Sequence, residues 1–279
     1  MKQHLPLVVS ALTALLCLEA APAHAGYLTP RVPPNTTAPA AQSLGQLPFA
    51  PNLPLTLRTV TTANDGGPGS LREAIANSAA GDSITFALPL PATIALSNTL
   101  VIAVDLSVLG PGPAELTIER STAPNTPVFR VFEVDAGVVT LAGLTIRNGS
   151  AFSGTNIHDN LGGGILNQAN LTVSNCVITA NSAPTTDWGP NVPDPNFRFS
   201  LGFGAGIFSS GGQLTVINST VSDNQATAEG GGIYTFEAAP FLAQGSTLSG
   251  NFAAIAGGGL GFQGRIPLHQ PRVRRALGE

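Results

Sequence analysis

The chain has 279 residues, of which 43% are hydrophobic, 10% charged and 6% aromatic, and its formal net charge is −4 at pH 7. A chain of this length can bury a long, narrow core, and one domain accounts for it. Between Gly26 and Gly264 seven Arg stand against 14 acidic residues, which argues against nucleic acid and against an anionic membrane as partners.

The segment from Met1 to Ala25 has the features of a secretory signal peptide. Lys2 and His4 precede an apolar run from Leu5 to Leu18, and Ala23-His24-Ala25 is the small-x-small pattern of a cleavage site. The run is too short for a membrane span, and no other stretch of the chain is apolar for long enough. We therefore expect a secreted or cell-surface protein with no transmembrane segment once the signal is removed.

The segment 26–54 is expected to form an extended, Pro-rich linker. Seven prolines fall among Thr, Ala and Asn in this stretch, a composition typical of extended linkers. A strand-like segment, Leu55 to Thr62, then begins the folded domain, which we place at 55–264.

One amphipathic helix is predicted near 70–78. Ser70 and Glu73 stand at capping-box spacing, Leu71 and Ile75 share a face, and Gly81 is expected to end the helix. Because the open end of a stacked-strand domain needs a cover, we expect the helix to cap the N-terminal end. The alternative is a helix that binds a partner. The first coil is expected to begin at Ser83 to Phe86.

The second half of the chain repeats. Four Gly-rich steps lead into an apolar residue, and they begin at Gly162, Gly204, Gly230 and Gly257. The first spacing exceeds the others because the long segment 182–203 separates Asn181 from Gly204, whereas only the short segment 225–229 separates Asn224 from Gly230. Without this excess, each repeat has about 25 residues, a period typical of solenoids.

The repeat has the period of strands. Apolar residues alternate at Leu171 and Val173 and again at Leu214 and Val216. Three short strands and three turns fit within one repeat, so the sequence predicts an all-β, right-handed parallel β-helix, with handedness following the rule for parallel crossovers. The expected stacks are Leu171 on Leu214 and Phe241, Ile178 on Val221 and Leu248, and the small residues Cys176, Ser219 and Ser246.

Asn181, Asn224 and Asn251 recur at one turn of each repeat. An inward amide there can bond to backbone carbonyls and to the amide of the next coil, so we interpret the three as a structural ladder. Cys17 leaves with the signal peptide, and Cys176 is then the only cysteine of the mature chain, which makes an intrachain disulfide impossible. Its inward position is typical of a buried, unreactive thiol.

Two motifs resemble known families. Gly67 to Ile75, followed by Gly81 to Phe86, resembles the Leu-Arg-Glu-Ala-Ile module (CSLREA-type domain) at the start of secreted bacterial right-handed β-helix proteins, although Gly69 stands where that module has its Cys. The Gly-Gly-Gly-Ile steps and the apolar-x-x-Asn endings are similar to repeats of polymorphic outer-membrane proteins. The resemblance covers roughly Thr59 to Phe262 and implies export and fold rather than an activity.

The best functional candidates lie in two insertions, 149–161 and 182–203. Both leave the turn after a strand and return to a Gly step, so we expect them to be neighbours on one edge. Their candidate binding residues are His158, Asp159, Trp188, Phe197, Arg198 and Phe199. Such an aromatic and polar mixture suits a glycan or a protein partner. The alternative is that the aromatic residues only pin a long loop.

No catalytic constellation is recognisable. The enzymes of this superfold use clustered Asp with Arg, Lys or His, whereas the Asp residues here are scattered, and His158 with Asp159 lacks a third metal ligand at usual spacing. We therefore expect no metal and no cofactor, and an adhesin-like or glycan- or protein-binding scaffold that is not an enzyme. The alternative is a polysaccharide lyase or glycoside hydrolase.

The segment 265–279 breaks the repeat and carries four Arg. Two interpretations remain open. The segment is a basic surface-binding tail, or it marks a truncated or frame-shifted reading frame.

Overall fold

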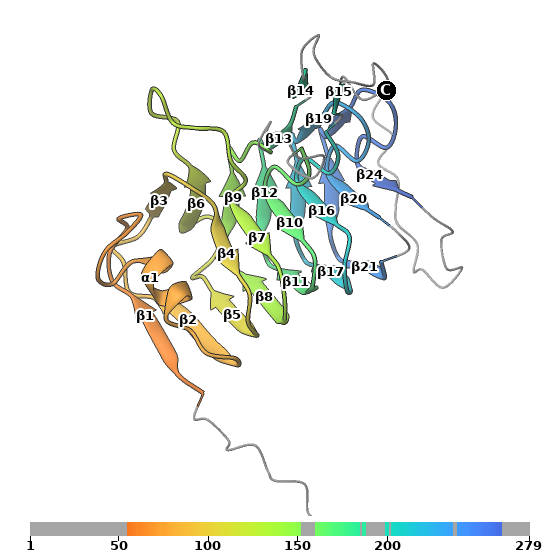
Figure 1. Ribbon diagram of the computed structural model, residues 1–279. Helices are drawn as coiled ribbons and strands as arrows, with labels where there is room; N and C mark the ends of the chain where they lie inside the picture. The colour runs from red at the N-terminus through yellow and green to blue at the C-terminus, as the bar shows by residue number, and fades with distance from the viewer. Residues whose placement is uncertain are drawn as a thin grey trace, which may run out of the picture. The chain divides into compact units, whose positions relative to one another are not determined.

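The computed structural model describes residues 55–151, 160–184, 186–187, 199–200, 202–236 and 239–263. Within these residues the strands form three long parallel sheets, stacked coil upon coil (Figure 1). Sheet A contains, in spatial order, β1 (Leu57–Val60), β2 (Asp82–Phe86), β5 (Leu106–Leu109), β8 (Val138–Ala142), β11 (Asn170–Ser174), β17 (Leu214–Ile217) and β21 (Phe241–Gln244).

Sheets B and C each contribute one strand to every complete coil. Sheet B contains β3 (Ala92–Leu96), β6 (Leu116–Arg120), β9 (Thr145–Arg147), β12 (Val177–Thr179), β18 (Thr220–Ser222) and β22 (Thr247–Ser249). Sheet C contains β4 (Leu100–Ile102), β7 (Phe132–Val134), β10 (Ile165–Asn167), β16 (Ile207–Ser209), β20 (Ile233–Thr235) and β24 (Leu260–Phe262). Because the chain passes from A to B to C and back to A, the described coils form a parallel β-helix.

The predicted stacks are confirmed. Leu171 pairs with Leu214, which pairs with Phe241, and Ile178 pairs with Val221, which pairs with Leu248. Leu171, Ile178, Leu214 and Val221 are at most 1% exposed. The first glycine of each Gly step has a φ between +61° and +66°, a backbone conformation that residues with a Cβ resist, so the turn into sheet C requires glycine there.

The expectation of three strands per coil is incomplete for the later coils. A fourth, short parallel sheet, here sheet D, contains β13 (Ser182–Ala183), β19 (Gln225–Ala226) and β23 (Phe252–Ala253). It follows the Asn turn directly, and its inward residues are the alanines Ala183, Ala226 and Ala253. Alternation of polar and small residues over only two positions gave no strand signal in the sequence.

The predicted helix is α1 (Leu71–Ala76), which lies between β1 and β2 in the chain (Figure 1). Its Leu71 and Ile75 are buried in the main core, and the helix contacts β1 and β4, the first strands of sheets A and C. The expected end at Gly81 is wrong. Asn77 is the C-cap. Its N–H donates to the Glu73 carbonyl and the Ser78 N–H donates to the Ile75 carbonyl, so the helix ends before Gly81 is reached. Gly81 instead has a φ of +91° in the turn that enters β2.

Arg72 of α1 ties the helix to the neighbouring turns of the N-terminal coil. Arg72 donates to Asp65 and to the carbonyls of Asn98 and Thr99, which lie in the turn between β3 and β4.

Within the described residues, no helix is long and apolar enough to cross a membrane.

Candidate binding surface

The recurring asparagines form one continuous chain of hydrogen bonds through three coils. The Asn181 Nδ2 donates to Asn224 Oδ1 at 2.9 Å, and the Asn224 Nδ2 donates to Asn251 Oδ1 at 2.9 Å. Each amide also donates to a carbonyl of the preceding coil. The acceptors are Ile146 O for Asn181, Ile178 O for Asn224 and Val221 O for Asn251. Since these bonds use the amide groups within the coils, the asparagines have a structural role in holding adjacent coils together.

Cys176 belongs to a second internal ladder. Its backbone N–H donates to Ser219 Oγ at 3.1 Å, and the Ser219 N–H donates to Ser246 Oγ at 3.1 Å. The cysteine is 2% exposed, and burial raises the pKa of Cys176 to about 11. A thiol that stays protonated and out of solvent is a poor nucleophile.

The two insertions begin and end side by side. Ser150 and Ser182, where the insertions leave the coils, form a parallel bridge, and their hydroxyls are 2.9 Å apart in a hydrogen bond. Leu161 and Phe203, where the insertions return, form a second parallel bridge. The two insertions therefore leave and rejoin the coils next to each other, as expected. We call these four positions the insertion roots.

Part of the larger insertion is a hairpin. β14 (Thr186–Asp187) pairs antiparallel with β15 (Phe199–Ser200), and Asp187 lies opposite Phe199. Of the predicted binding residues, only the backbone of Phe199 is described. His158, Asp159, Trp188, Phe197 and Arg198 lie outside the described residues, so their role as binding residues stays a prediction.

An apolar cluster that the sequence analysis missed lies on the outer face of sheet C. We call it the outer cluster, and it consists of Leu161, Leu166, Phe203, Phe208, Tyr234 and Phe236. Leu166, Phe208 and Tyr234 are the central residues of three adjacent strands, and they point away from the core because their neighbours Ile165, Ile207 and Ile233 point into it. Alternation within the Gly-Gly-Gly-Ile repeat was the signal that could have found them.

The aromatic rings of the outer cluster stack along the solenoid. The Phe208 and Tyr234 rings are 5.6 Å apart and 14° from parallel, and Phe203 meets Tyr234 at 5.0 Å with a 55° tilt. Phe208 and Tyr234 are only 4% exposed. Burial, together with the nearby Glu229 carboxylate, raises the pKa of Tyr234. Through Leu161 and Phe203, the cluster thus connects the points where both insertions rejoin the coils to the aromatic rings of sheet C.

Charged side chains continue the same face toward the N-terminus. Glu133 lies in register with Leu166, and Arg130 Nη1 donates to Glu133 Oε2 at 2.8 Å. Asp135 lies nearby. Burial and the Glu133 charge raise the pKa of Asp135, and the opposing effect of Arg130 is smaller. Within the described residues, no group of three or more His, Cys, Asp or Glu is placed to hold a metal ion.

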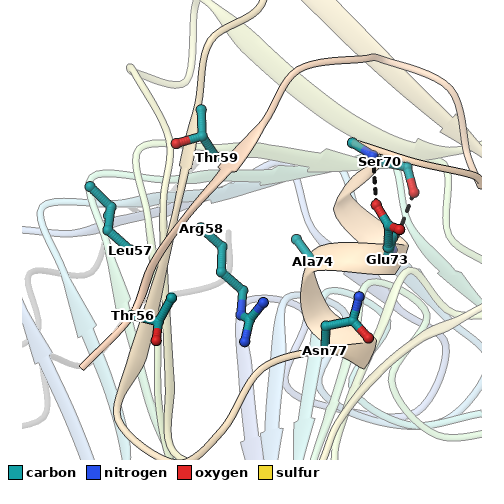
Figure 2. Close-up of a pocket in the computed structure, with 9 residues that line it drawn as sticks. Thr56, Leu57, Arg58, Thr59, Ser70, Glu73, Ala74 and Asn77 are labelled. Carbon is teal, nitrogen blue, oxygen red and sulfur yellow. Dashed lines mark hydrogen bonds between the residues drawn. The ribbon is translucent and has the colours of Figure 1, made fainter. Parts of the chain in front are cut away.

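A separate groove of about 280 Å³ lies between β1 and α1 (Figure 2). Its walls include Arg58, Ser70, Glu73 and Asn77. Most of its polar groups already serve the fold. Ser70 Oγ accepts from the Glu73 N–H, Glu73 Oε2 accepts from the Gly69 N–H at 2.6 Å, and Arg58 Nε is 3.0 Å from Asp82 Oδ2.

Stacked parallel sheets and continuous internal ladders define the fold as an all-β, right-handed parallel β-helix. A family model described as "Right handed beta helix region" matches residues 138–263. No curated protein and no solved structure matches the chain. The matched residues include both insertion roots and the outer cluster.

Proposed function

We propose that this protein is an exported, non-enzymatic β-helix scaffold that binds a glycan or a protein through its two insertions. The apolar run and cleavage pattern of the segment 1–25 support export, and so does the resemblance of Leu71 to Ile75 to the module of secreted β-helix proteins. The β-helix fold supports a scaffold, because such coils present extended surfaces built from their loops and outer faces.

One observation carries the proposal. The residues at which the two insertions rejoin the coils pair with each other and form part of the outer cluster. Leu161 and Phe203 are bridged across adjacent coils and both belong to that cluster. The residues between the roots include His158, Trp188 and Arg198. An apolar cluster at the points where two insertions with aromatic and polar residues return to the coils is an arrangement suited to recognition, since loops carry function when a scaffold positions them.

The single tryptophan gives a direct test. Trp188 is the only Trp of the chain, so tryptophan emission reports on the larger insertion alone. We would titrate the full chain without its signal peptide with neutral and acidic polysaccharides, with and without calcium, and record emission and the release of new chain ends in the same samples. The proposal expects a saturable change in emission with at least one polymer and no new ends.

Two controls sharpen this titration. Trp188→Phe should abolish the tryptophan emission. Affinity electrophoresis of this variant should show weaker retention on the polymers that the parent binds, with the same order of preference among them. Release of chain ends that a single Asp or Arg substitution abolishes would overturn the proposal in favour of a lyase or hydrolase. Absence of any polymer binding would restrict the proposal to a protein partner.

A further inference from the structure

A third loop leaves the solenoid at the same turn as the two insertions. The 121–128 loop extends beyond β6 and leads from sheet B to sheet C through β7 (Figure 1). The first insertion makes the same passage one coil later, between β9 and β10, and the second makes it between β12 and β16. The three connections therefore leave from one edge on three successive coils.

Hydrogen bonds attach this loop to the first insertion at both of its ends. Beyond its end, the Phe129 carbonyl accepts from the N–H of Ser150, an insertion root, at 2.9 Å. Before its start, Arg120 Nε donates to the Asn148 carbonyl at 2.9 Å. The 121–128 loop is thus tied to the root of the first insertion, as that root is tied to Ser182 of the second.

The tip of the loop has a defined shape. The Thr126 N–H donates to the Ala123 carbonyl at 3.1 Å, and Asn125 has a φ of +66°. With Pro124 before it, Asn125 occupies the third position of a type II β-turn, where a positive φ is required and where glycine or asparagine is favoured. The turn therefore holds Asn125 at the tip.

Arg120 closes the base of the loop. Its Nη1 donates to the carbonyls of Ser121 and Pro127, at 3.3 Å and 3.4 Å. One guanidinium thus holds both sides of the loop while it bonds to the chain that enters the first insertion. A loop that is fixed before binding loses little conformational entropy when a ligand arrives.

The loop presents uncharged polar groups. The 121–128 segment contains no Asp, Glu, Lys, Arg or His, and Thr122 and Asn125 are exposed. Within the described residues, the Asn125 amide makes no hydrogen bond, so it can both donate to and accept from a ligand hydroxyl. The charges beside the loop are already compensated, since Arg147 Nε lies 2.6 Å from Glu119 Oε2.

We infer that the 121–128 loop is a third element of the binding surface at this edge, that Asn125 contacts the ligand, and that the ligand is an uncharged glycan. The inference rests on the proposed function for the presence of a binding surface here. An acidic polysaccharide is disfavoured because Arg120 and Arg147 are engaged within the fold. A protein partner is disfavoured because its usual anchors, aromatic and Arg side chains, are absent from this loop.

Asn125→Gly tests the contact with the turn left intact, because glycine accepts a positive φ. The full chain without its signal peptide would be run in native gels that contain dextran, galactomannan, hydroxyethylcellulose or pectate. The parent should be retained by at least one of the three neutral polymers. On that polymer, Asn125→Gly should weaken retention about fivefold, the size expected for the loss of one hydrogen bond.

Asn175→Gly is the matched control. Asn175 is also exposed and has a φ of +49°, but it lies in the turn between β11 and β12, where the chain passes from sheet A to sheet B. This variant should be retained like the parent. Both variants should keep the melting temperature of the parent to within a few degrees, so that weaker retention reports a lost contact rather than lost folding.

The outcomes separate this inference from the proposed function. If Asn125→Gly is retained like the parent on a polymer whose retention the deletion of 185–201 abolishes, the role of the loop is overturned and the proposed function stands. If Asn125→Gly weakens retention and the deletion does not, the loop is upheld and the larger insertion is contradicted. A parent retained by none of the neutral polymers, or by pectate alone, would overturn the inferred ligand class and with it the inference.

Discussion

Replacing Asn224 by Leu should destabilise the solenoid severely, because this side chain is the centre of the asparagine ladder. It is completely buried, it accepts from the N–H and the Nδ2 of Asn181, and it donates to Ile178 O and to Asn251 Oδ1. Leucine has a similar volume, so the change removes hydrogen bonds and creates almost no cavity.

The magnitude follows from the groups left without partners. The Asn181 N–H and the Ile178 carbonyl lose a bond each, and the Asn181 Nδ2 keeps only its bond to Ile146 O. Each buried polar group left unpaired costs about 1–3 kcal/mol, so we expect the free energy of unfolding to fall by roughly 3–6 kcal/mol. A loss of this size is a large part of the roughly 5–15 kcal/mol that folded proteins typically have.

Urea unfolding followed by far-UV circular dichroism measures this loss. Ser222→Ala, in β18 two residues before Asn224, is the matched control, since it removes one hydrogen bond of 3.1 Å to Thr179 Oγ1 on the outer side, and should cost about 0.5–1 kcal/mol. If Asn224→Leu cost less than about 1 kcal/mol, a typical net value for one hydrogen bond, the ladder would not hold the coils together.

Three further predictions concern the core, the N-terminal coil and the thiol. Val221→Asp puts an unpaired charge at a completely buried stack position and should prevent folding, so a soluble variant with unchanged circular dichroism and melting temperature would contradict the stacking. Hydrogen bonds from the Ala79 and Thr56 N–H groups, opposed by burial and aided by Arg58, lower the pKa of Asp82, so its stabilising effect is present above its unfolded pKa of about 4 and is lost as pH falls below it. Asp82→Asn should flatten this acid loss in pH-dependent melting curves. Cys176, with its pKa raised to about 11, should react with iodoacetamide at pH 8 only after unfolding, and rapid labelling of the folded protein would show that the stack opens.

The coils after Asn160 could be predicted in register because their signals repeat. Gly162, Gly204 and Gly230 mark one turn, Asn181 and Asn224 mark another, and the inward residues between them align without gaps. Repetition raises a weak strand pattern above the noise of a single segment.

The earlier coils gave no such signal, and the outer cluster gave only the alternation within the Gly-Gly-Gly-Ile repeat. β4 and β7 are short strands with no Gly step before them, and they are recognisable only by their pairing with each other and with β10. Leu166, Phe208 and Tyr234 differ from one another in side-chain type, and their burial arises from contacts with Leu161, Phe203 and Phe236 across coils. Where the residue type changes from coil to coil, a pattern along the sequence does not show which side chains of adjacent coils meet on the outer face.

Removal of the larger insertion tests most directly whether regular coils carry a separable binding element. Without the segment from Thr185 to Leu201, only Pro184, Gly202 and Phe203 connect Ala183 to Gly204, a connection as short as the one that Thr227 to Glu229 makes between Ala226 and Gly230. The backbone of Gly202 already lies in contact with the carbonyl of Ala183, so joining Pro184 directly to Gly202 needs little rearrangement.

The measurement compares this deletion variant with the parent by thermal melting and by affinity electrophoresis on a polymer that the parent binds. We predict that the melting temperature falls by no more than about 4 °C, which corresponds to roughly 1–2 kcal/mol for a domain of this size, and that retention on the polymer is lost. A variant that fails to fold would show that the insertion is structural. A folded variant that is retained like the parent would place the binding surface elsewhere and contradict the account.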